Sequence, residues 1–162
     1  MYEAIARAAK IVMVVVGVLA VTGCAKQQVN QTGALAAGTA VPGTAQDFVV
    51  NVGDRIFFQT DSSELTAQAR ETLDKQVLWL GHYSAYAFTI EGHADERGTR
   101  EYNIALGARR AQTVHDYFTS RGISAQRMHT ISYGKERPVA VCDDNSCWSQ
   151  NRRAVVVLDQ TS

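Results

Sequence analysis

Residues 90–118 read IEGHADERGTREYNIALGARRAQTVHDYF, and this stretch decides the fold because it joins a predicted strand to a long predicted helix. The strand breaks at Gly92, and a polar loop that carries Asp95 follows it. Thr99 is a good helix N-cap, and Glu101 places an acid in the first turn, where the helix dipole favours negative charge. We therefore expect a strand, a polar loop and a helix in succession.

One face of this helix follows the 3.6-residue period and should be buried. It comprises Asn103, Leu106, Arg110, Val114, Tyr117 and Phe118. An unpaired guanidinium is too costly to leave in a core, so Arg110 must be paired or must reach a polar cleft. Its obvious partner is Asp95, either in a structural salt bridge or across a cleft that binds a ligand. Both alternatives stay open, because buried ion pairs are not always functional.

The rest of the chain alternates predicted strands with one further helix. The strands are expected at residues 48–52, 55–58, 85–91, 128–133 and 154–158, and the first two should form a hairpin. The further helix should begin after Thr66 and end at Gly81, and the long helix should end at Arg121 and Gly122. These elements predict an α/β fold, with one small sheet and two main helices packed on it.

The N-terminal residues 1–23 have the layout of a secretory signal peptide. An apolar run over residues 11–21 follows two basic residues and is too short to span a bilayer. A short membrane anchor or a buried helix is the alternative. Residues 24–47 are rich in Gln, Ala, Gly and Thr, and such a composition predicts a flexible linker. The folded domain is therefore expected at residues 48–160.

Three motifs carry a family resemblance: GHADERGTREYN at 92–103, LGARRA at 106–111 and NRRAVVV at 151–157. Together they resemble the OmpA-like peptidoglycan-binding domain, an α/β sandwich with a small mixed sheet. The form GHADERGT is most similar to the lipoprotein branch, the peptidoglycan-associated lipoproteins of the Tol-Pal system. This resemblance implies a protein that binds peptidoglycan non-covalently, tethers the outer membrane to the wall in envelope integrity and cell division, and has a TolB-like periplasmic propeller protein as a partner.

The resemblance also implies a ligand site. In the family, the Asp and the second Arg of these motifs, here Asp95 and Arg110, hold the free end of meso-diaminopimelate in the stem peptide. That side chain ends in an ammonium and a carboxylate, which an acid and a planar base can bind together. Secondary candidates for ligand contact are Phe58, Gln59, Thr60, Arg97, Thr99, Asn103, Leu106, Asn151 and Arg152. For the last two, a purely structural role in the loop is an equal alternative. Many family members have an acid where this chain has Gln59, which weakens the case for a charged contact there but leaves main-chain contacts from Phe58 to Thr60 as an expectation.

The three cysteines divide into one predicted lipidation site and one pair. The motif VTGC at 21–24 resembles a bacterial lipobox, with Val21 in place of the usual Leu, and cleavage before Cys24 would leave that residue lipidated in the outer membrane. Cys142 and Cys147 would then form a disulfide in an oxidising periplasm. Metal binding by these cysteines and the acids between them is the alternative, but no histidine or second cysteine pair lies at zinc-site spacing.

No enzyme, cofactor or nucleic-acid function is expected. The sequence lacks a GxSxG elbow, an HExxH motif and a phosphate loop, and its 16 basic and 16 acidic residues give no electrostatic case for nucleic acid. A wall hydrolase is one alternative, although it would need a nucleophile or a metal. The other is an OmpA-like structural module whose main partner is another envelope protein.

Overall fold

The computed structural model describes residues 40–159. The predicted signal peptide, Cys24 and most of the predicted linker lie outside the described residues. Within residues 40–159, no helix is long and apolar enough to cross a membrane.

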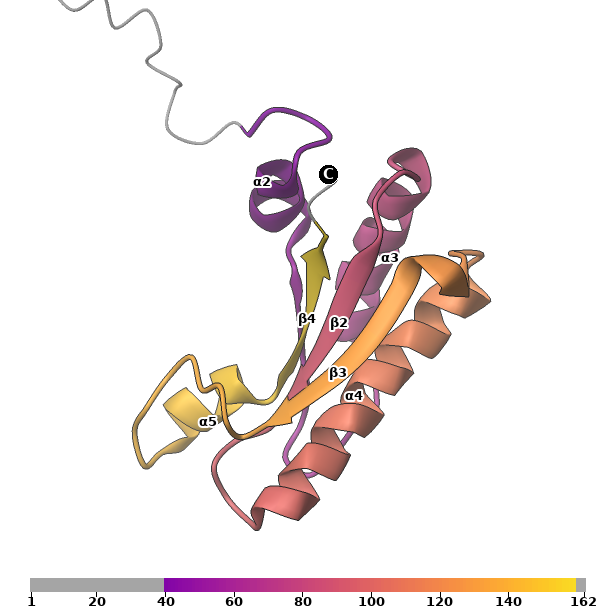
Figure 1. Ribbon diagram of the computed structural model, residues 1–162. Coiled ribbons are helices and arrows are strands. Elements are labelled where there is room, and N and C mark those ends of the chain that lie inside the picture. The colour runs from indigo at the N-terminus through magenta and orange to yellow at the C-terminus, as the bar shows by residue number, and fades with distance from the viewer. Residues whose placement is uncertain (1–39, 160–162) are drawn as a thin grey trace, which may run out of the picture. The chain divides into compact units, whose positions relative to one another are not determined.

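A four-stranded mixed sheet forms the centre of the domain (Figure 1). Its strands are β1 (Arg55–Phe57), β2 (Phe88–His93), β3 (Met128–Gly134) and β4 (Arg153–Leu158), in the order β1-β4-β2-β3. β4 runs antiparallel to both β1 and β2, whereas β2 and β3 are parallel. The β-branched run of β4 therefore has a strand on each side, as a central position favours.

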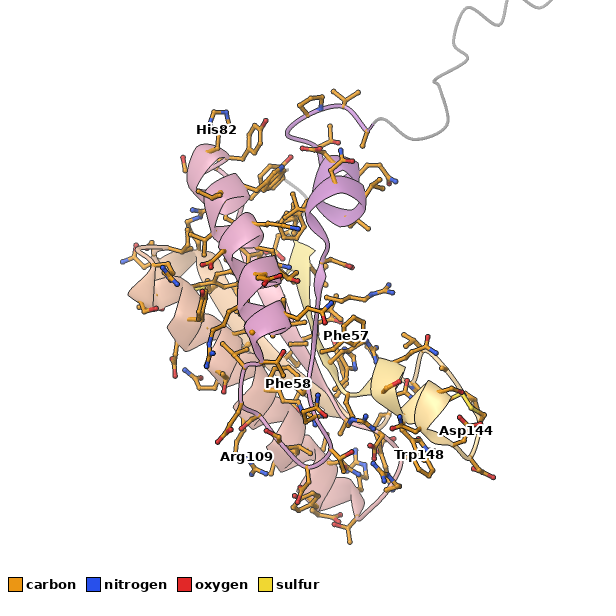
Figure 2. All side chains as sticks on the ribbon, turned by 180° about the vertical axis from the view of Figure 1, so that it is seen from behind. Phe57, Phe58, His82, Arg109, Asp144 and Trp148 are labelled. Atoms are coloured by element: carbon orange, nitrogen blue, oxygen red, sulfur yellow. A yellow bond between two sulfur atoms is a disulfide. The ribbon has the colours of Figure 1, made fainter. Side chains whose placement is uncertain are left out.

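Two long helices, α3 (Ala67–His82) and α4 (Arg100–Ser120), pack on one face of this sheet (Figures 1 and 2). Thr66 and Thr99 are their N-caps, and each side-chain oxygen accepts a hydrogen bond from the backbone N–H three residues on. Both predicted caps are confirmed. The remaining helical segments are short: α2 (Ala45–Asp47), the π-helix η1 (Phe48–Val52), the 3-10 helix η2 (Ala125–Arg127) and α5 (Asn145–Asn151).

The hydrophobic core lies between the sheet and these two helices. The strands contribute alternate residues, Ile56, Phe88, Ile90, Ala154 and Val156, all at most 2% exposed. The helices contribute Leu73, Leu80, Val114 and Phe118 from their buried stripes. The mixed sheet with two main helices packed on it is thus confirmed, and so is the buried face predicted for the long helix.

The predicted strand at residues 48–52 is wrong, because this segment is the π-helix η1. The Asp47 carboxylate accepts hydrogen bonds from the backbone of Gly43, the Asn51 amide and the buried indole of Trp79, and these bonds stabilise a helical turn. Phe48 is fully buried against the Trp79 ring. Tertiary contacts therefore override the β-branched pattern, and β1 pairs with β4 instead of forming the expected hairpin.

Several further boundaries differ from the sequence-based expectation, and the ends of β1 and β3 and the start of β4 differ by a single residue. Helix α3 continues through Gly81 to His82, and strand β2 begins at Phe88 and runs through Gly92 to His93. Packing also begins upstream of Phe48, because the Tyr86 hydroxyl donates to the Gly43 carbonyl at 2.8 Å.

Helix α4 approaches the sheet closely where Gly107 faces Gly92 of β2. A Cβ atom placed on Gly92 would lie 1.8 Å from the Gly107 carbonyl oxygen, and one on Gly107 would lie 2.9 Å from the Gly92 carbonyl oxygen. Neither backbone leaves room for a side chain, so glycine is required at both positions. This contact brings the first half of α4 against the end of β2, where the polar loop begins.

We expect Gly92→Ala to lower the free energy of unfolding by about 3 kcal/mol, because α4 must move away from the sheet to admit a methyl group. Urea denaturation followed by circular dichroism measures this change. Gly81→Ala is the matched control: nothing lies within 4 Å of its Cβ position, and the helix should gain up to about 1 kcal/mol. Equal stability of the two variants would contradict the close contact.

Candidate functional site

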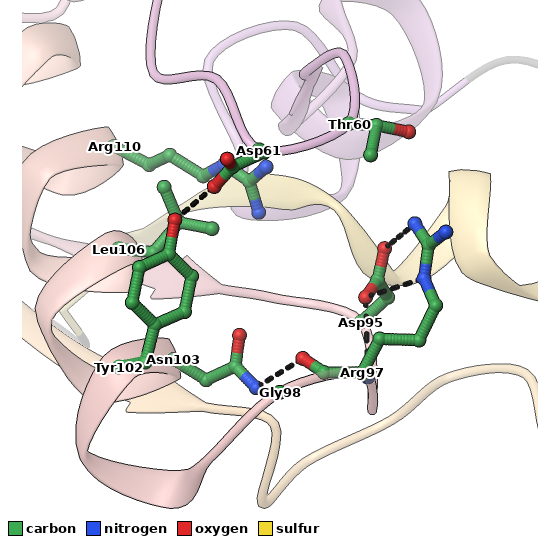
Figure 3. Close-up of a pocket in the computed structure, with 9 residues that line it drawn as sticks. All are labelled: Thr60, Asp61, Asp95, Arg97, Gly98, Tyr102, Asn103, Leu106 and Arg110. Atoms are coloured by element: carbon green, nitrogen blue, oxygen red, sulfur yellow. Dashed lines mark hydrogen bonds and ion pairs between the residues drawn. The ribbon is translucent and has the colours of Figure 1, made fainter.

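A cleft of about 270 Å³ lies where the loop after β1 meets the loop after β2 and the first half of α4 (Figure 3). It is lined by Thr60, Asp61, Asp95, Arg97, Gly98, Tyr102, Asn103, Leu106 and Arg110. Six of these nine residues were ligand-site candidates from sequence. The cleft therefore joins residues that lie up to 50 positions apart in the chain.

Arg110 lies at the base of this cleft and is fully buried. Its guanidinium donates to three backbone carbonyls: from Nε to Ser62 (2.9 Å), from Nη1 to His93 (2.8 Å) and from Nη2 to Gln59 (3.1 Å). A guanidinium has five N–H donors, so two are left over. Burial lowers the pKa of Arg110 to about 10, against the opposing charge of Asp95, and the side chain remains a cation at neutral pH.

The direct salt bridge between Arg110 and Asp95 that the sequence suggested is wrong. Among the described residues, Arg110 forms no ion pair with any acid, and Asp95 pairs with two other arginines. The two charges line the same cleft without meeting. The second alternative from sequence, a cleft between the two side chains, is therefore the arrangement in the structure.

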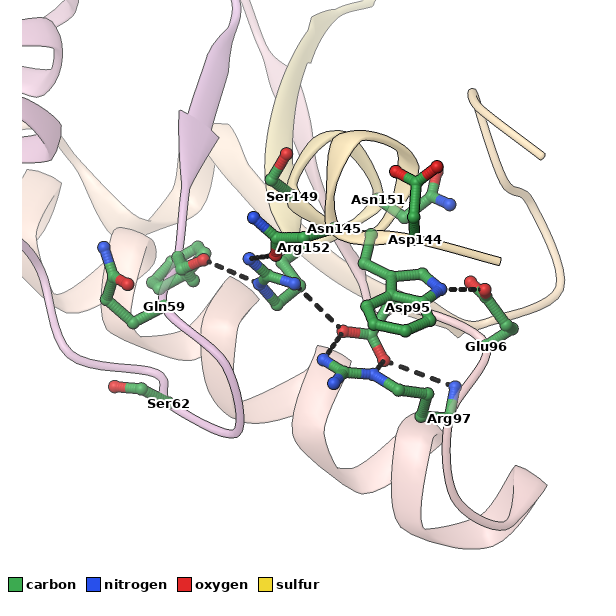
Figure 4. Close-up of polar contacts among 12 residues, drawn as sticks. Gln59, Ser62, Asp95, Glu96, Arg97, Asp144, Asn145, Ser149, Asn151 and Arg152 are labelled. Atoms are coloured by element: carbon green, nitrogen blue, oxygen red, sulfur yellow. Dashed lines mark hydrogen bonds and ion pairs between the residues drawn. The ribbon is translucent and has the colours of Figure 1, made fainter. Parts of the chain in front are cut away.

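Asp95 is held between an exposed and a buried arginine (Figure 4). Arg97 bonds both carboxylate oxygens, at 3.2 Å from Nε to Oδ1 and 2.7 Å from Nη2 to Oδ2, and Arg152 contacts Oδ2 from Nη1 at 3.3 Å. Burial alone would raise the pKa of Asp95, but the hydrogen bonds from both arginines outweigh burial and hold that pKa below its ordinary value of 3.8. Asp95 is therefore ionised at neutral pH.

Arg152 connects the cleft to the helix α5. Besides Asp95, its guanidinium donates to the Phe58 carbonyl (3.2 Å) and to Oδ1 of Asn145 (3.2 Å), and the residue is only 5% exposed. Its neighbour Asn151 does not reach the cleft. The Asn151 amide instead bonds the backbone of Val139 and Ala140, which fixes the loop before α5.

The other sequence-predicted candidates divide between the cleft wall and its supports. Asn103 and Leu106 line the cleft, and the Asn103 amide donates to the Arg97 carbonyl at 2.8 Å. Thr99 caps α4 and is not part of the lining. Phe58 and Gln59 contribute carbonyls to Arg152 and Arg110 rather than side chains to the cleft.

Sequence reasoning missed three residues of the cleft, Asp61, Gly98 and Tyr102, and the side chains of Asp61 and Tyr102 hydrogen-bond each other across it. Tyr102 lies outside the buried stripe of α4 and is 43% exposed, so helical periodicity gives no signal for it. Asp61 has a positive φ of 54°, the only such non-glycine value among residues 40–159, and its position depends on how the loop after β1 folds.

His93 contributes its carbonyl to Arg110, but its ring has no hydrogen-bond partner among the described residues. Burial lowers the pKa of this ring to about 4, helped by the nearby charges of Arg153 and Arg137, so the imidazole is neutral at pH 7. The 3.6 Å contact between His93 and Glu91 is then not an ion pair.

A disulfide between Cys142 and Cys147 joins the first turn of α5 to the loop before it. The next residue, Trp148, donates to the Glu96 carboxylate, and its ring lies 4.2 Å from the Arg97 guanidinium carbon. Helix α5 therefore supports both arginines that hold Asp95. In the part of the chain that the structure describes, no three His, Cys, Asp or Glu side chains group as metal ligands would.

The open mixed sheet, the two helices on one face and the acid and buried arginine at its end define an OmpA-like domain. The sequence profile of the OmpA family matches residues 57–153. The peptidoglycan-associated lipoprotein of Rhizobium meliloti is 61% identical over 152 residues, which cover 91% of this chain and 86% of that protein. That of Brucella abortus is 63% identical over 145 residues, with 87% and 86% covered.

Comparison with solved structures points to the same family. The crystal structure of the peptidoglycan-associated lipoprotein from Burkholderia pseudomallei matches with a TM-score of 0.67 at 33% identity, over 72% of this chain and all of that one. The C-terminal domain of Helicobacter pylori MotB shares the fold, with a TM-score of 0.62 at 17% identity, over 67% of this chain and 86% of that one. The chain belongs to the OmpA family and, within it, to the peptidoglycan-associated lipoproteins.

We expect Asp95→Asn to lower the free energy of unfolding by about 2 kcal/mol at pH 7, because an amide cannot form charge-assisted bonds and leaves Arg152 without its counter-ion. The folded carboxyl has a pKa below 3.8, so its contribution is complete above about pH 5 and is lost as the pH falls through the folded pKa. The difference between parent and variant should therefore shrink between pH 5 and pH 2.

Urea denaturation across that pH range measures this difference. Asp143→Asn is the control, since Asp143 is exposed and its side chain makes no hydrogen bond among the described residues. A parent-minus-variant difference that stays constant down to pH 2 would exclude the ionised carboxylate as its cause.

Proposed function

We propose that this domain binds peptidoglycan non-covalently through the meso-diaminopimelate of the stem peptide. The observation that carries the proposal is the state of Arg110: a buried cation in a cleft, held only by neutral carbonyls and with two N–H donors to spare. An arriving carboxylate would meet a preorganised guanidinium in a site of low dielectric constant, where such contacts are strong. The names of the relatives, each a peptidoglycan-associated lipoprotein, support peptidoglycan as the polymer that is bound.

The charges around the cleft suit a zwitterion. Its lining holds two acids, Asp61 and Asp95, and two bases, Arg97 and Arg110, so the cleft has no net charge. A ligand end with one positive and one negative group keeps the charges in the cleft balanced. Arg97 has a 42% exposed side chain, and its guanidinium occupies the Asp95 oxygens that a ligand ammonium would use. We infer that the ammonium competes with Arg97 for Asp95, while the Trp148 ring offers the displaced guanidinium a second contact.

Binding to the wall becomes a tether if the chain is also anchored in the outer membrane. The signal-peptide layout and the lipobox-like motif that ends at Cys24 support a lipid anchor, and the word lipoprotein in the relatives' names agrees with it. A TolB-like partner and a role in the Tol-Pal system during division rest on the family resemblance. In this proposal the domain is a binding module, which agrees with the names of the relatives, since these describe association with peptidoglycan.

We expect Arg110→Ala to weaken binding to diaminopimelate-type peptidoglycan by about 10- to 100-fold, since it removes a charge-assisted contact of roughly 1.5–3 kcal/mol. Co-sedimentation of the protein with purified sacculi measures the affinity. Arg109→Ala is the matched control, because Arg109 is the adjacent, exposed residue on α4 and should bind as the parent does.

The parent protein alone provides a second test that does not depend on the folding of a variant. Stem peptides with lysine in place of diaminopimelate lack the second carboxylate, so the parent should bind lysine-type sacculi about 10- to 100-fold more weakly. Equal binding to both wall types, together with full binding by a folded Arg110→Ala variant, would refute the proposal. It would favour a structural module whose partner is another envelope protein.

A further inference from the structure

A second and larger groove, of about 470 Å³, lies beside the cleft on the other side of the loop after β1. It runs between this loop, the start of α3 and the helix α5. The size falls within the range of about 300–1,000 Å³ that is usual for small-molecule sites. The two principal candidates for contact with diaminopimelate, Asp95 and Arg110, do not line this groove, although the secondary candidates Phe58, Gln59 and Arg152 do.

The side chains of the groove are mostly amides and hydroxyls. Six of its nine lining residues are of this kind: Gln59, Thr66, Gln68, Asn145, Ser149 and Gln150. Amides and hydroxyls can both donate and accept hydrogen bonds, as a ligand with many hydroxyl groups requires. The side chains of Gln59 and Gln68 make no hydrogen bond among the described residues and are exposed, so they are available to a ligand.

The groove carries one charged side chain, and that charge is already neutralised. Arg152 is 5% exposed and pairs with Asp95 on the cleft side. A ligand with free carboxylates would find no other cation among the residues that line the groove. The chemistry therefore favours a neutral, polar ligand over an acidic peptide.

An exposed aromatic ring completes the lining. Phe57 on the edge strand β1 is 49% exposed, while its neighbour Phe58 is buried, and both residues lie near α5 (Figure 2). A phenyl ring beside amides suits a sugar ring, whose C–H face packs on the aromatic surface while its hydroxyls bond the amides.

The groove and the cleft are formed by neighbouring residues, and Arg152, which lines the groove, links the two by its bond to Asp95. Gln59 lines the groove and Thr60 lines the cleft, and Arg152 contacts Asp95 through Nη1 and Asn145 through Nη2 (Figure 4). In a stem peptide, two amino acids separate diaminopimelate from the sugar, a reach of roughly 10 Å when extended. A ligand held in the cleft would thus bring its sugar to this part of the surface.

We propose that the groove between β1, α3 and α5 binds the glycan strand of peptidoglycan through its neutral N-acetylated sugars. That the sugar belongs to peptidoglycan rests on the proposed function. That the groove binds a neutral sugar is argued from its lining residues alone. The glycan fits because its hydroxyl and acetamido groups carry no charge and its lactyl carboxyl is bound up in an amide.

Two probes with the full chain test this proposal by NMR. Peptide-free glycan strands whose lactyl carboxyls have been converted to amides, so that they carry no charge, should shift the amide signals of Asn145, Ser149, Gln59 and Gln68, whether or not Arg110 is intact. A sugar-free stem peptide ending in diaminopimelate should shift the signals around Asp95 instead. If glycan strands leave the groove signals unchanged, or if the peptide alone shifts them, the groove is not a sugar site.

Variants give an independent measurement. Gln68→Ala and Phe57→Ala should weaken binding of a disaccharide-peptide by about three- to tenfold and leave binding of the sugar-free peptide unchanged. Gln126→Ala and Ile131→Ala are matched controls, since Gln126 is exposed, Ile131 is 41% exposed, and both lie outside the groove. Equal weakening for both probes would overturn the proposal.

The two proposals fail in different ways. If the parent does not bind the sugar-free peptide but its groove signals respond to glycan strands, the diaminopimelate site is wrong and the glycan groove stands. If the parent binds the peptide through Arg110 and the groove does not respond to glycan strands, only the glycan groove is wrong.

Discussion

The buried guanidinium of Arg110 is the interaction on which the site depends. It bonds Gln59 and Ser62 in the loop after β1 and His93 at the end of β2, and so joins both loops of the cleft to α4. Burying such a charge costs several kcal/mol of desolvation free energy, and three hydrogen bonds from a charged donor offset most of that cost. The arginine is thus tolerated by the fold with little net stabilisation, and its remaining donors are left for a ligand.

The acid of the site is held by a different part of the chain. Arg152 and Arg97 fix Asp95, and both are supported by α5, through Asn145 in one case and Trp148 in the other. The disulfide at the start of α5 limits how that helix can move relative to the loop before it. The position of the Arg110 cation is therefore set by the helix α4, and that of the Asp95 carboxylate by the C-terminal segment. Both depend on contacts between residues that are far apart in the sequence.

Much of this arrangement is readable from the sequence, for reasons that are local. The 3.6-residue stripe of α4 showed that Arg110 points into the core, and the two threonine caps located the starts of α3 and α4. The strand β4 is a β-branched run that suits a sheet interior. The motifs around Asp95 and Arg110, through their family resemblance, named the two charges of the site.

Other features required the tertiary structure, because they depend on contacts between distant residues. The sequence predicted a strand at residues 48–52, yet the bond from Trp79 to Asp47 stabilises a helical turn there. It suggested an Asp95–Arg110 pair, yet backbone carbonyls hold Arg110 and two other arginines hold Asp95. The local sequence pattern was enough to predict the two long helices, the four strands of the sheet and the burial of Arg110. The partners of the buried charges followed from the packed fold alone, since bonds such as Arg110 to Gln59 and Arg152 to Asp95 join residues more than 50 positions apart and depend on how the loops meet, not on local periodicity.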